Sequence, residues 1–177
     1  MQDKIGWIGL GSMGNRMAKN LAKNGYQMLV TDKMDTSAAP QSAHVATTNS
    51  EVISEANILI LSIPAGPDTL EITQEILNSP SSSVEIVIDT STIGIPDAKQ
   101  AAELLSKKGI EYVDAPVSGG IAGADSATLA VMVGCKENIF NRIQPILKCI
   151  GANIFHVGPN PGQGQTVKLL NNFLSAT

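Results

Sequence analysis

The stretch GLGSMG, residues 9–14, most constrains what this chain can fold into. It places Gly9, Gly11 and Gly14 in the G-x-G-x-x-G spacing. The apolar run KIGWIGL leads into it, and the segment NRMAKNLAKNG, with apolar side chains at helical spacing, follows it. A glycine turn between a buried strand and a helix is the context in which this spacing binds the pyrophosphate of a dinucleotide.

Each glycine of the turn has its own expected task. Gly9 permits the tight turn, Gly11 lets the backbone approach a pyrophosphate, and Gly14 allows the helix to pack closely on the strand. The helix that follows offers unpaired N–H groups and the positive end of its dipole to the phosphates. We therefore expect the whole turn to contact a dinucleotide. Its residues are Gly9, Leu10, Gly11, Ser12, Met13 and Gly14.

An acidic residue stands where the second strand is predicted to end. Asp32 closes the run QMLVTD, residues 27–32, and lies 18 positions after Gly14. A carboxylate at this place accepts hydrogen bonds from the adenosine ribose hydroxyls and repels a 2′-phosphate, which favours NAD as the cofactor. The neighbouring Lys33 could partly compensate the negative charge, so NADP stays an alternative. A carboxylate that only caps the turn is the other alternative.

Apolar runs and amphipathic stretches alternate along the whole chain. Such alternation predicts an α/β fold, a Rossmann-like, doubly wound and mainly parallel sheet with helices on both faces. Asn49 or Ser50 should cap the helix that starts there, and any helix within 33–50 should be a turn or two. The predicted strands are 4–10, 27–32, 44–47, 58–63, 85–90, 111–115, 128–134 and 152–157. The predicted helices are 15–25, 50–56, 68–77, 96–109, 137–150 and 166–176.

Composition narrows the class of protein further. The 177 residues carry a net charge of −4, which argues against nucleic acid or a membrane surface as the main partner. The apolar run NILILSIPAG is too short to span a bilayer, and the amino terminus does not look like a signal peptide. Cys135 and Cys149 form neither a disulfide framework nor a metal motif. We therefore expect no metal site and a cytoplasmic location.

Three stretches together resemble the β-hydroxyacid dehydrogenases, the family of 3-hydroxyisobutyrate dehydrogenase and tartronate semialdehyde reductase. They are GWIGLGSMGNRMAKNLAKNGY (6–26), DAPVSGGIAGADSATLAVMVG (114–134) and GQGQTVKLLNN (162–172). The resemblance implies an NAD(P)-dependent oxidoreductase that interconverts a short 3-hydroxy acid, its small-molecule partner, and the semialdehyde. It also implies a dinucleotide-binding domain at 1–161 and the start of an interdomain helix at 162–177, with the family's C-terminal all-helical domain absent.

The same resemblance assigns roles to residues. Lys168 would be the catalytic acid and base, and Asn172, four positions later on the same helix face, would orient the lysine or the substrate hydroxyl. Ser118, Gly119 and Gly120 would bind the substrate carboxylate, since a glycine-rich loop can point several N–H groups at an anion. Further cofactor contacts would come from loops after parallel strands. These contacts are Ile63, Pro64, Asp68 and Thr92.

The chain also departs from the family pattern. Ala127 stands where the family usually has glycine, which should stiffen the loop slightly without loss of function. Segment 33–43 is shorter than usual and contains Pro40, so the helix after the second strand should be reduced, which changes the adenine side of the cofactor site. Family dimers rely on the helical domain, so a homo-oligomer stays open. An apolar helix face would pack at the domain junction, formed by Leu169, Leu170, Phe173 and Leu174.

Other interpretations stay open beside the dehydrogenase. The chain could be a truncated, non-catalytic nucleotide-binding module. Imine reductases are related, but they generally lack the catalytic lysine, so Lys168 speaks against them. A decarboxylating enzyme of the 6-phosphogluconate type has a similar fold, but the basic residues that its substrate phosphate needs are largely supplied elsewhere.

Overall fold

The chain folds around one nine-stranded sheet in the order β3-β2-β1-β4-β5-β6-β8-β7, with β9 paired to β8. The structure is a computed structural model that describes residues 3–175. The strands are β1 (Ile5–Ile8), β2 (Met28–Thr31), β3 (His44–Val45), β4 (Ile58–Leu61), β5 (Ile86–Asp89), β6 (Glu111–Asp114), β7 (Val117–Ser118), β8 (Ala130–Gly134) and β9 (Asn153–Gly158). The helices are α1 (Gly14–Lys23), α2 (Asn49–Glu55), α3 (Gly66–Asn78), α4 (Ile95–Ser106), α5 (Gly120–Asp125), α6 (Glu137–Leu147) and α7 (Gln163–Ser175).

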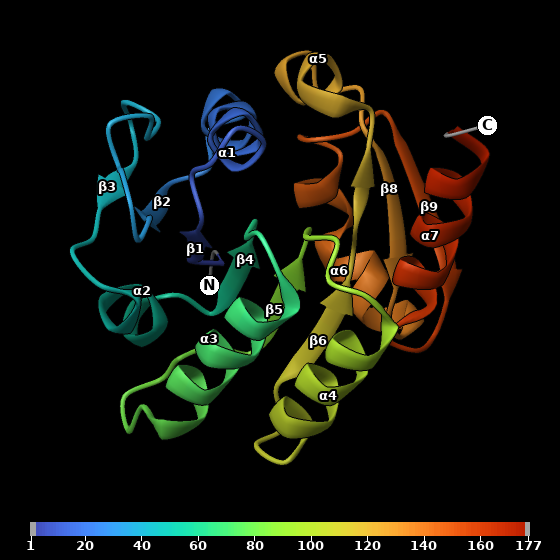
Figure 1. Ribbon diagram of the computed structural model, residues 1–177. Coiled ribbons are helices and arrows are strands. Elements are labelled where there is room, and N and C mark those ends of the chain that lie inside the picture. The colour runs from blue at the N-terminus through green and yellow to red at the C-terminus, as the bar shows by residue number, and fades with distance from the viewer. Residues whose placement is uncertain (1–2, 176–177) are drawn as a thin grey trace.

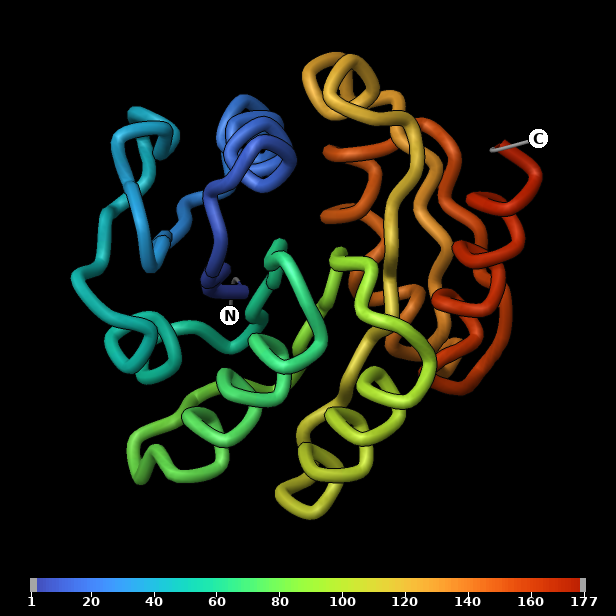
Figure 2. Tube along the Cα trace, in the orientation of Figure 1, coloured from blue at the N-terminus to red at the C-terminus, as the bar shows by residue number. Residues whose placement is uncertain are grey.

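The sheet is wound in two directions from its middle. β1 pairs in parallel with β2 on one side and with β4 on the other, and parallel pairing continues from β4 to β6. Figure 2 traces the chain from β1 out to β3 at one edge and then back across to β9 at the other. β8 runs antiparallel to β6 and β7, and β9 pairs in parallel with β8. The doubly wound, mainly parallel sheet is therefore confirmed, and its order reverses beside β1.

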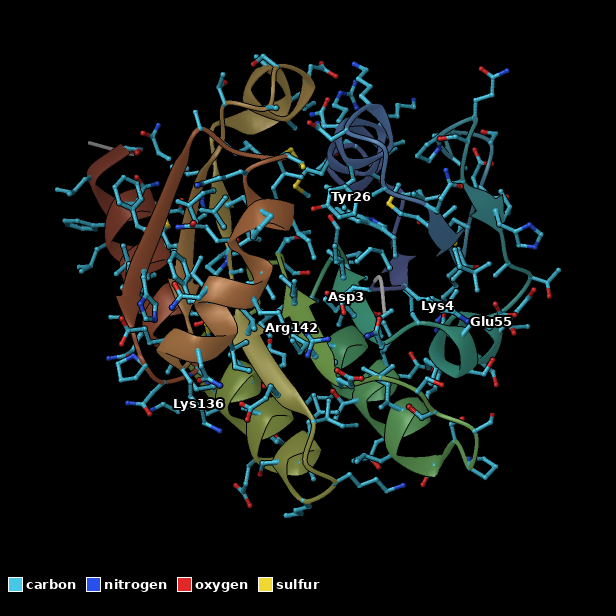
Figure 3. All side chains as sticks on the ribbon, turned by 180° about the vertical axis from the view of Figure 1, so that it is seen from behind. Asp3, Lys4, Tyr26, Glu55, Lys136 and Arg142 are labelled. Atoms are coloured by element: carbon cyan, nitrogen blue, oxygen red, sulfur yellow. The ribbon has the colours of Figure 1, made fainter. Side chains whose placement is uncertain are left out.

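Alternate side chains of each strand face opposite layers of helices, as the two-residue period of a strand requires. In β4, Ile58 and Ile60 belong to the core shared with α1 and α6, whereas Leu59 and Leu61 belong to the core shared with α2, α3 and α4. Figure 1 shows α3 and α4 on the near face of the sheet, and Figure 3, seen from behind, shows α1 and α6 on the other. Both faces are thus covered, which explains why the strands read as continuous apolar runs.

Ion pairs fasten α6 to the amino ends of the strands (Figure 3). Arg142 donates to Asp3 just before β1 at 2.7 Å and pairs with Glu85 just before β5 at 2.9 Å. Lys136, just before α6, donates to Glu111 at the start of β6 at 2.6 Å. These contacts lie at the edge where the parallel strands begin. The opposite edge, where the strands end, carries loops that are free to line a site.

Two local predictions were wrong in detail. Thr48 caps α2, with an extended backbone and a side-chain oxygen that accepts from Glu51 N at 3.2 Å, whereas Asn49 and Ser50 already lie inside the helix. Helix α7 begins at Gln163 instead of residue 166, and its predicted end at 176 lies outside the described residues. Turns occupy residues 33–43, so the short, Pro40-containing segment holds no helix in the described structure, as its composition suggested.

The glycine-rich loop after β6 contains structure that the sequence did not predict. It holds the short strand β7 and the helix α5, both within a stretch read as loop because of its glycines. Strand β7 forms because Val117 and Ser118 pair with Val131 and Ala130 of β8. Helix α5 packs against α1, where Asn20 Nδ2 donates to the carbonyl of Ala124 at 2.7 Å. Both elements depend on distant partners, which a local pattern does not reveal.

Candidate active site

A cavity of about 1130 Å³ opens where the parallel strands end, beside the reversal of strand order. Ordinary ligand pockets measure roughly 300–1,000 Å³, so this cavity has room for a ligand as large as a dinucleotide. Every candidate cofactor, substrate and catalytic residue named from the sequence lines it, from Gly9 in the first turn to Asn172 in the last helix. Tertiary structure therefore brings together residues that lie more than 150 positions apart.

The three glycines of the first turn differ in what surrounds them. Gly9 has φ +100°, and a Cβ there would lie 2.2 Å from the carbonyl oxygen of Ser62. A Cβ at Gly14 would lie 2.1 Å from the Gly9 carbonyl oxygen, which itself accepts from the indole N–H of Trp7 at 2.8 Å. A Cβ at Gly11 would meet nothing within 4 Å. The fold itself requires Gly9 and Gly14, whereas a side chain at Gly11 would point into open space at the cavity wall.

The Asp32 carboxylate ties the end of β2 to this turn. Its Oδ2 accepts from Leu10 N at 2.6 Å, and its Oδ1 accepts from Met34 N at 2.7 Å and Asp35 N at 3.1 Å. Partial burial disfavours the charged carboxylate, but these three N–H groups outweigh it and lower the pKa of Asp32 below its ordinary value. The group is therefore a fixed negative charge at the cavity wall. It caps the turn and lines the cavity at once.

Lys168 projects from α7 at the cavity wall, and only 9% of its surface is exposed. Burial disfavours the ammonium and lowers the pKa of Lys168 below its ordinary value. Asn172, one turn further along the helix, also lines the cavity. Because a lowered pKa makes the neutral amine more accessible near neutral pH, this lysine is suited to exchange a proton with a bound molecule.

The Ser118–Gly120 loop faces the lysine across the cavity. Gly119 and Gly120 have φ +134° and +63°, so both hold left-handed conformations that a side chain would strain. Ser118 Oγ accepts from Asn171 Nδ2 of α7 at 2.9 Å. The loop is therefore tied directly to the helix that carries Lys168, and its backbone lies open to the cavity.

The sequence did not point to Asn171 or Ser91 as parts of this site. Asn172 was the expected residue, and Asn171 beside it supplies the hydrogen bond to Ser118. Ser91 lines the cavity, and its hydroxyl accepts from Ile63 N at 2.9 Å, which joins two loops that were each expected to contact the cofactor. The position of Ser91 directly after an apolar strand was a usable signal, since ligands lie at the carboxyl ends of such strands.

The described part of the chain offers no obvious metal site and no membrane span. Within residues 3–175, His, Cys, Asp and Glu side chains do not gather in groups of three or more that could hold an ion. No helix in the same range is long and apolar enough to cross a membrane.

The fold and the site together identify the class of protein. A doubly wound sheet with a glycine turn, an open cradle at Gly11 and an acidic residue after β2 is a dinucleotide-binding α/β domain. Comparison with known families gives the more particular answer. The chain belongs to the family described as the NAD binding domain of 6-phosphogluconate dehydrogenase, which matches residues 4–158.

Individual relatives are hydroxy acid dehydrogenases by name. The chain is 39% identical over 181 residues to 2-(hydroxymethyl)glutarate dehydrogenase of Eubacterium barkeri, covering 97% of this chain and 58% of that protein. It is 38% identical to mitochondrial 3-hydroxyisobutyrate dehydrogenase of Rattus norvegicus, covering 97% and 52% respectively. A solved structure of Mycobacterium tuberculosis 3-hydroxyisobutyrate dehydrogenase with L-serine superposes with a TM-score of 0.91 at 35% identity, covering 99% of this chain and 61% of that one. The chain thus spans little more than half the length of these relatives.

Proposed function

We propose that this chain forms the cofactor-binding part of an NAD(P)-dependent oxidoreductase that transfers a hydride between a short 3-hydroxy acid and its semialdehyde. The observation that carries the proposal is the single cavity lined by the glycine turn, the Ser118–Gly120 loop and Lys168. A module that only binds a nucleotide would need the glycine turn. It would not need a buried lysine that lines the same cavity. The names of the relatives support the substrate class.

In the proposed mechanism the residues of the chain bind, orient and move one proton. Ser118 Oγ and the backbone N–H groups of Gly119 and Gly120 would hold the substrate carboxylate. Lys168 would donate a proton to the carbonyl oxygen in reduction, and its neutral amine would take the hydroxyl proton in oxidation. When bound, the nicotinamide supplies or accepts the hydride. Asn172 would orient the lysine or the substrate hydroxyl, and Asn171 would hold Ser118 in place.

The cofactor would lie along the carboxyl ends of β1, β2, β4 and β5. The pyrophosphate would contact residues 9–14, where the space at Gly11 fits a close backbone approach. Ile63, Pro64 and Asp68 would line the ribose, and Thr92, which is exposed to the cavity, would lie beside the nicotinamide. The proposed contacts all line one cavity, which supports this placement of a dinucleotide.

We propose a preference for NAD over NADP. The Asp32 carboxylate, ionised because three backbone N–H groups lower its pKa, would accept from the ribose hydroxyls and repel a 2′-phosphate. Lys33 is the cation nearest along the chain, but it is largely exposed and lies 3.9 Å from Glu71, whose carboxylate reduces its attraction for a phosphate. Titration with both cofactors tests this point, and equal affinity for NADP would contradict it.

Several whole-protein properties belong to the proposal as well. We propose that residues 1–161 form the dinucleotide-binding domain and that 162–177 begin the interdomain helix of the longer relatives. Hydride transfer by the 177-residue chain alone should then be very weak, because closing the site and excluding water would depend on the second domain. The two unpaired, buried cysteines support a reducing compartment such as the cytoplasm.

The test separates binding from chemistry. Gly11→Ala adds a methyl group where the protein has open space, so thermal stability should be unchanged while NAD affinity, measured by calorimetry, falls roughly ten- to a hundredfold. Lys168→Ala should keep NAD binding and abolish whatever hydride transfer to a semialdehyde the chain supports. Wild-type affinity in Gly11→Ala would contradict the cofactor site. Turnover that survives in Lys168→Ala would contradict the proposed role of Lys168 as the acid and base.

A further inference from the structure

One buried side chain that does not line the cavity contacts both the loop after β5, which lines it, and the end of β6. Gln165, in the first turn of α7, is 3% exposed. Its Oε1 accepts from the backbone N–H groups of Ile93 at 3.0 Å and Gly94 at 3.1 Å. Its Nε2 donates to the carbonyl of Ser91 at 3.0 Å and to Asp114 Oδ1 at 2.8 Å. A primary amide has two donors and two main acceptor positions, so all of them are used.

The Asp114 carboxylate acts as the N-terminal cap of α7, although it comes from the end of β6. Its Oδ2 accepts from Gly162 N at 2.8 Å and from Gln165 N at 3.0 Å. The first N–H groups of a helix have no partner within the helix, and a carboxylate at that end also interacts favourably with the helix dipole. Asp114 is fully buried, so water could not take over these bonds.

Two glycines press this helix start onto the sheet. A Cβ at Gly164 would lie 2.4 Å from the carbonyl oxygen of Met132 in β8. A Cβ at Gly134 would lie 2.8 Å from the carbonyl oxygen of Asn160, just before α7. The first turn of α7 is therefore held from two sides, by close backbone contact with β8 and by the hydrogen bonds of Gln165 and Asp114.

The position of this cluster relates it to the site. Lys168 is three residues after Gln165 and so lies on the same side of the helix, one turn further along. Thr92 lies between Ser91 and Ile93, both of which bond to the Gln165 amide. One side chain thus sets the placement of the loop that carries Thr92 relative to the helix that carries Lys168.

We infer that Gln165, supported by Asp114, is a positioning residue of the hydride-transfer site, holding Lys168 buried and at a fixed place relative to the 91–94 loop. This inference rests on the proposed function of Lys168. Neither residue lines the cavity, so each acts through Lys168 and Thr92 and touches neither substrate nor cofactor. A residue that only stabilised the fold would not change the titration of Lys168 in particular, whereas a positioning role predicts that change.

The test measures the titration of Lys168 in the chain without cofactor. Pulse acylation of lysines over a pH series, followed by peptide mass spectrometry, reports the pH at which each amine becomes reactive. In wild type, Lys168 should become reactive at lower pH than exposed lysines, because burial lowers its pKa. Gln165→Leu should raise the midpoint pH of Lys168 to that of the exposed lysines, because the first turn of α7 loosens and water reaches the ammonium. Gln100→Leu, at an exposed position of α4, should leave the Lys168 midpoint unchanged.

A charge swap keeps the inference testable if Gln165→Leu fails to fold. Gln165→Glu sets two buried carboxylates against each other and removes the donor to the Ser91 carbonyl. Adding Asp114→Asn restores a donor opposite an acceptor at position 114 with the wild-type net charge, whereas the Ser91 carbonyl still faces an acceptor. A Lys168 midpoint in the double variant that moves from the value of Gln165→Glu back toward wild type supports the inference. An unchanged Lys168 midpoint in folded Gln165→Leu, or a double variant no better than Gln165→Glu, overturns it. Failure of NAD binding would instead contradict the proposed function, since these titrations contain no cofactor.

Discussion

At the scale of single residues, Ala127 stands out through its backbone. Its φ is +56°, and it is the one non-glycine residue among positions 3–175 with a positive φ. This conformation costs an alanine roughly 1–2 kcal/mol, and here it closes α5, where Thr128 N donates to the carbonyl of Gly123 at 2.9 Å. The expectation that alanine only stiffens this loop therefore omitted a conformational cost.

Ala127→Gly should stabilise the chain. We expect the free energy of unfolding in urea to rise by about 0.5–1 kcal/mol, because the strain is relieved while glycine adds some freedom to the unfolded chain. Ala102→Gly, in the middle of α4, provides the matched control and should lower the free energy of unfolding by about 0.5–1 kcal/mol. A loss of stability in Ala127→Gly would mean that the turn does not strain the alanine.

Lys168 should make stability depend on pH. Burial lowers its pKa below 10.5, the ordinary value, so between the two pKa values the unfolded chain binds more protons and stability rises with pH. At pH values below the folded-state pKa of Lys168, the free-energy cost of burying its ammonium is present in full. Lys168→Met should therefore raise the melting temperature at pH 7, and the difference should shrink as pH rises toward 10.5.

The control for this prediction is Lys19→Met, at an exposed position of α1. It should change the melting temperature little at any pH in the same series. A Lys168→Met chain that is less stable than wild type at pH 7 would contradict the prediction. It would show that the lysine makes stabilising contacts that outweigh the cost of its burial.

At the scale of elements, the start of α7 depends on its approach to β8. Gly164→Ala would place a methyl group 2.4 Å from the Met132 carbonyl oxygen, so the helix start would have to move. We expect a loss of about 1–3 kcal/mol in the free energy of unfolding, measured by denaturation. Leu169→Ala, on the exposed side of the same helix, should stay within about 0.5 kcal/mol of wild type. Equal effects of the two variants would contradict close packing at Gly164.

Elements with strong local patterns were predictable and those made by distant contacts were not. The turn from β1 to α1 follows from its glycines and apolar spacing, and the structure forms both elements there. The cap of α2 was misplaced by one residue because Thr48, Asn49 and Ser50 are all good capping residues. Helix α5 was missed because its glycines predict a loop, whereas its packing on α1 makes it a helix.

At the scale of the whole molecule, α7 leaves an apolar face uncovered. Leu169, Leu170 and Phe173 are 65%, 58% and 68% exposed, as expected for a face that packs at a junction. Exposed apolar clusters of this kind promote association. We expect the chain to self-associate as its concentration rises in sedimentation experiments, and Leu170→Gln with Phe173→Gln to reduce this. NAD affinity should not change, because neither residue lines the cavity. Identical sedimentation of both proteins at every concentration would contradict the prediction.

The sequence by itself determined the α/β class, the mainly parallel sheet and many of the residues that line the cavity. Glycine spacing and apolar periodicity act over a few residues, so they can be read locally. Only the tertiary structure decided that Gln165 joins Ser91 to Asp114, positions 74 and 51 residues away from it. It also decided that Lys168 is buried. Such contacts depend on which distant elements become neighbours, and a glutamine in a helix looks the same in sequence whether it faces water or fills a buried hydrogen-bond network.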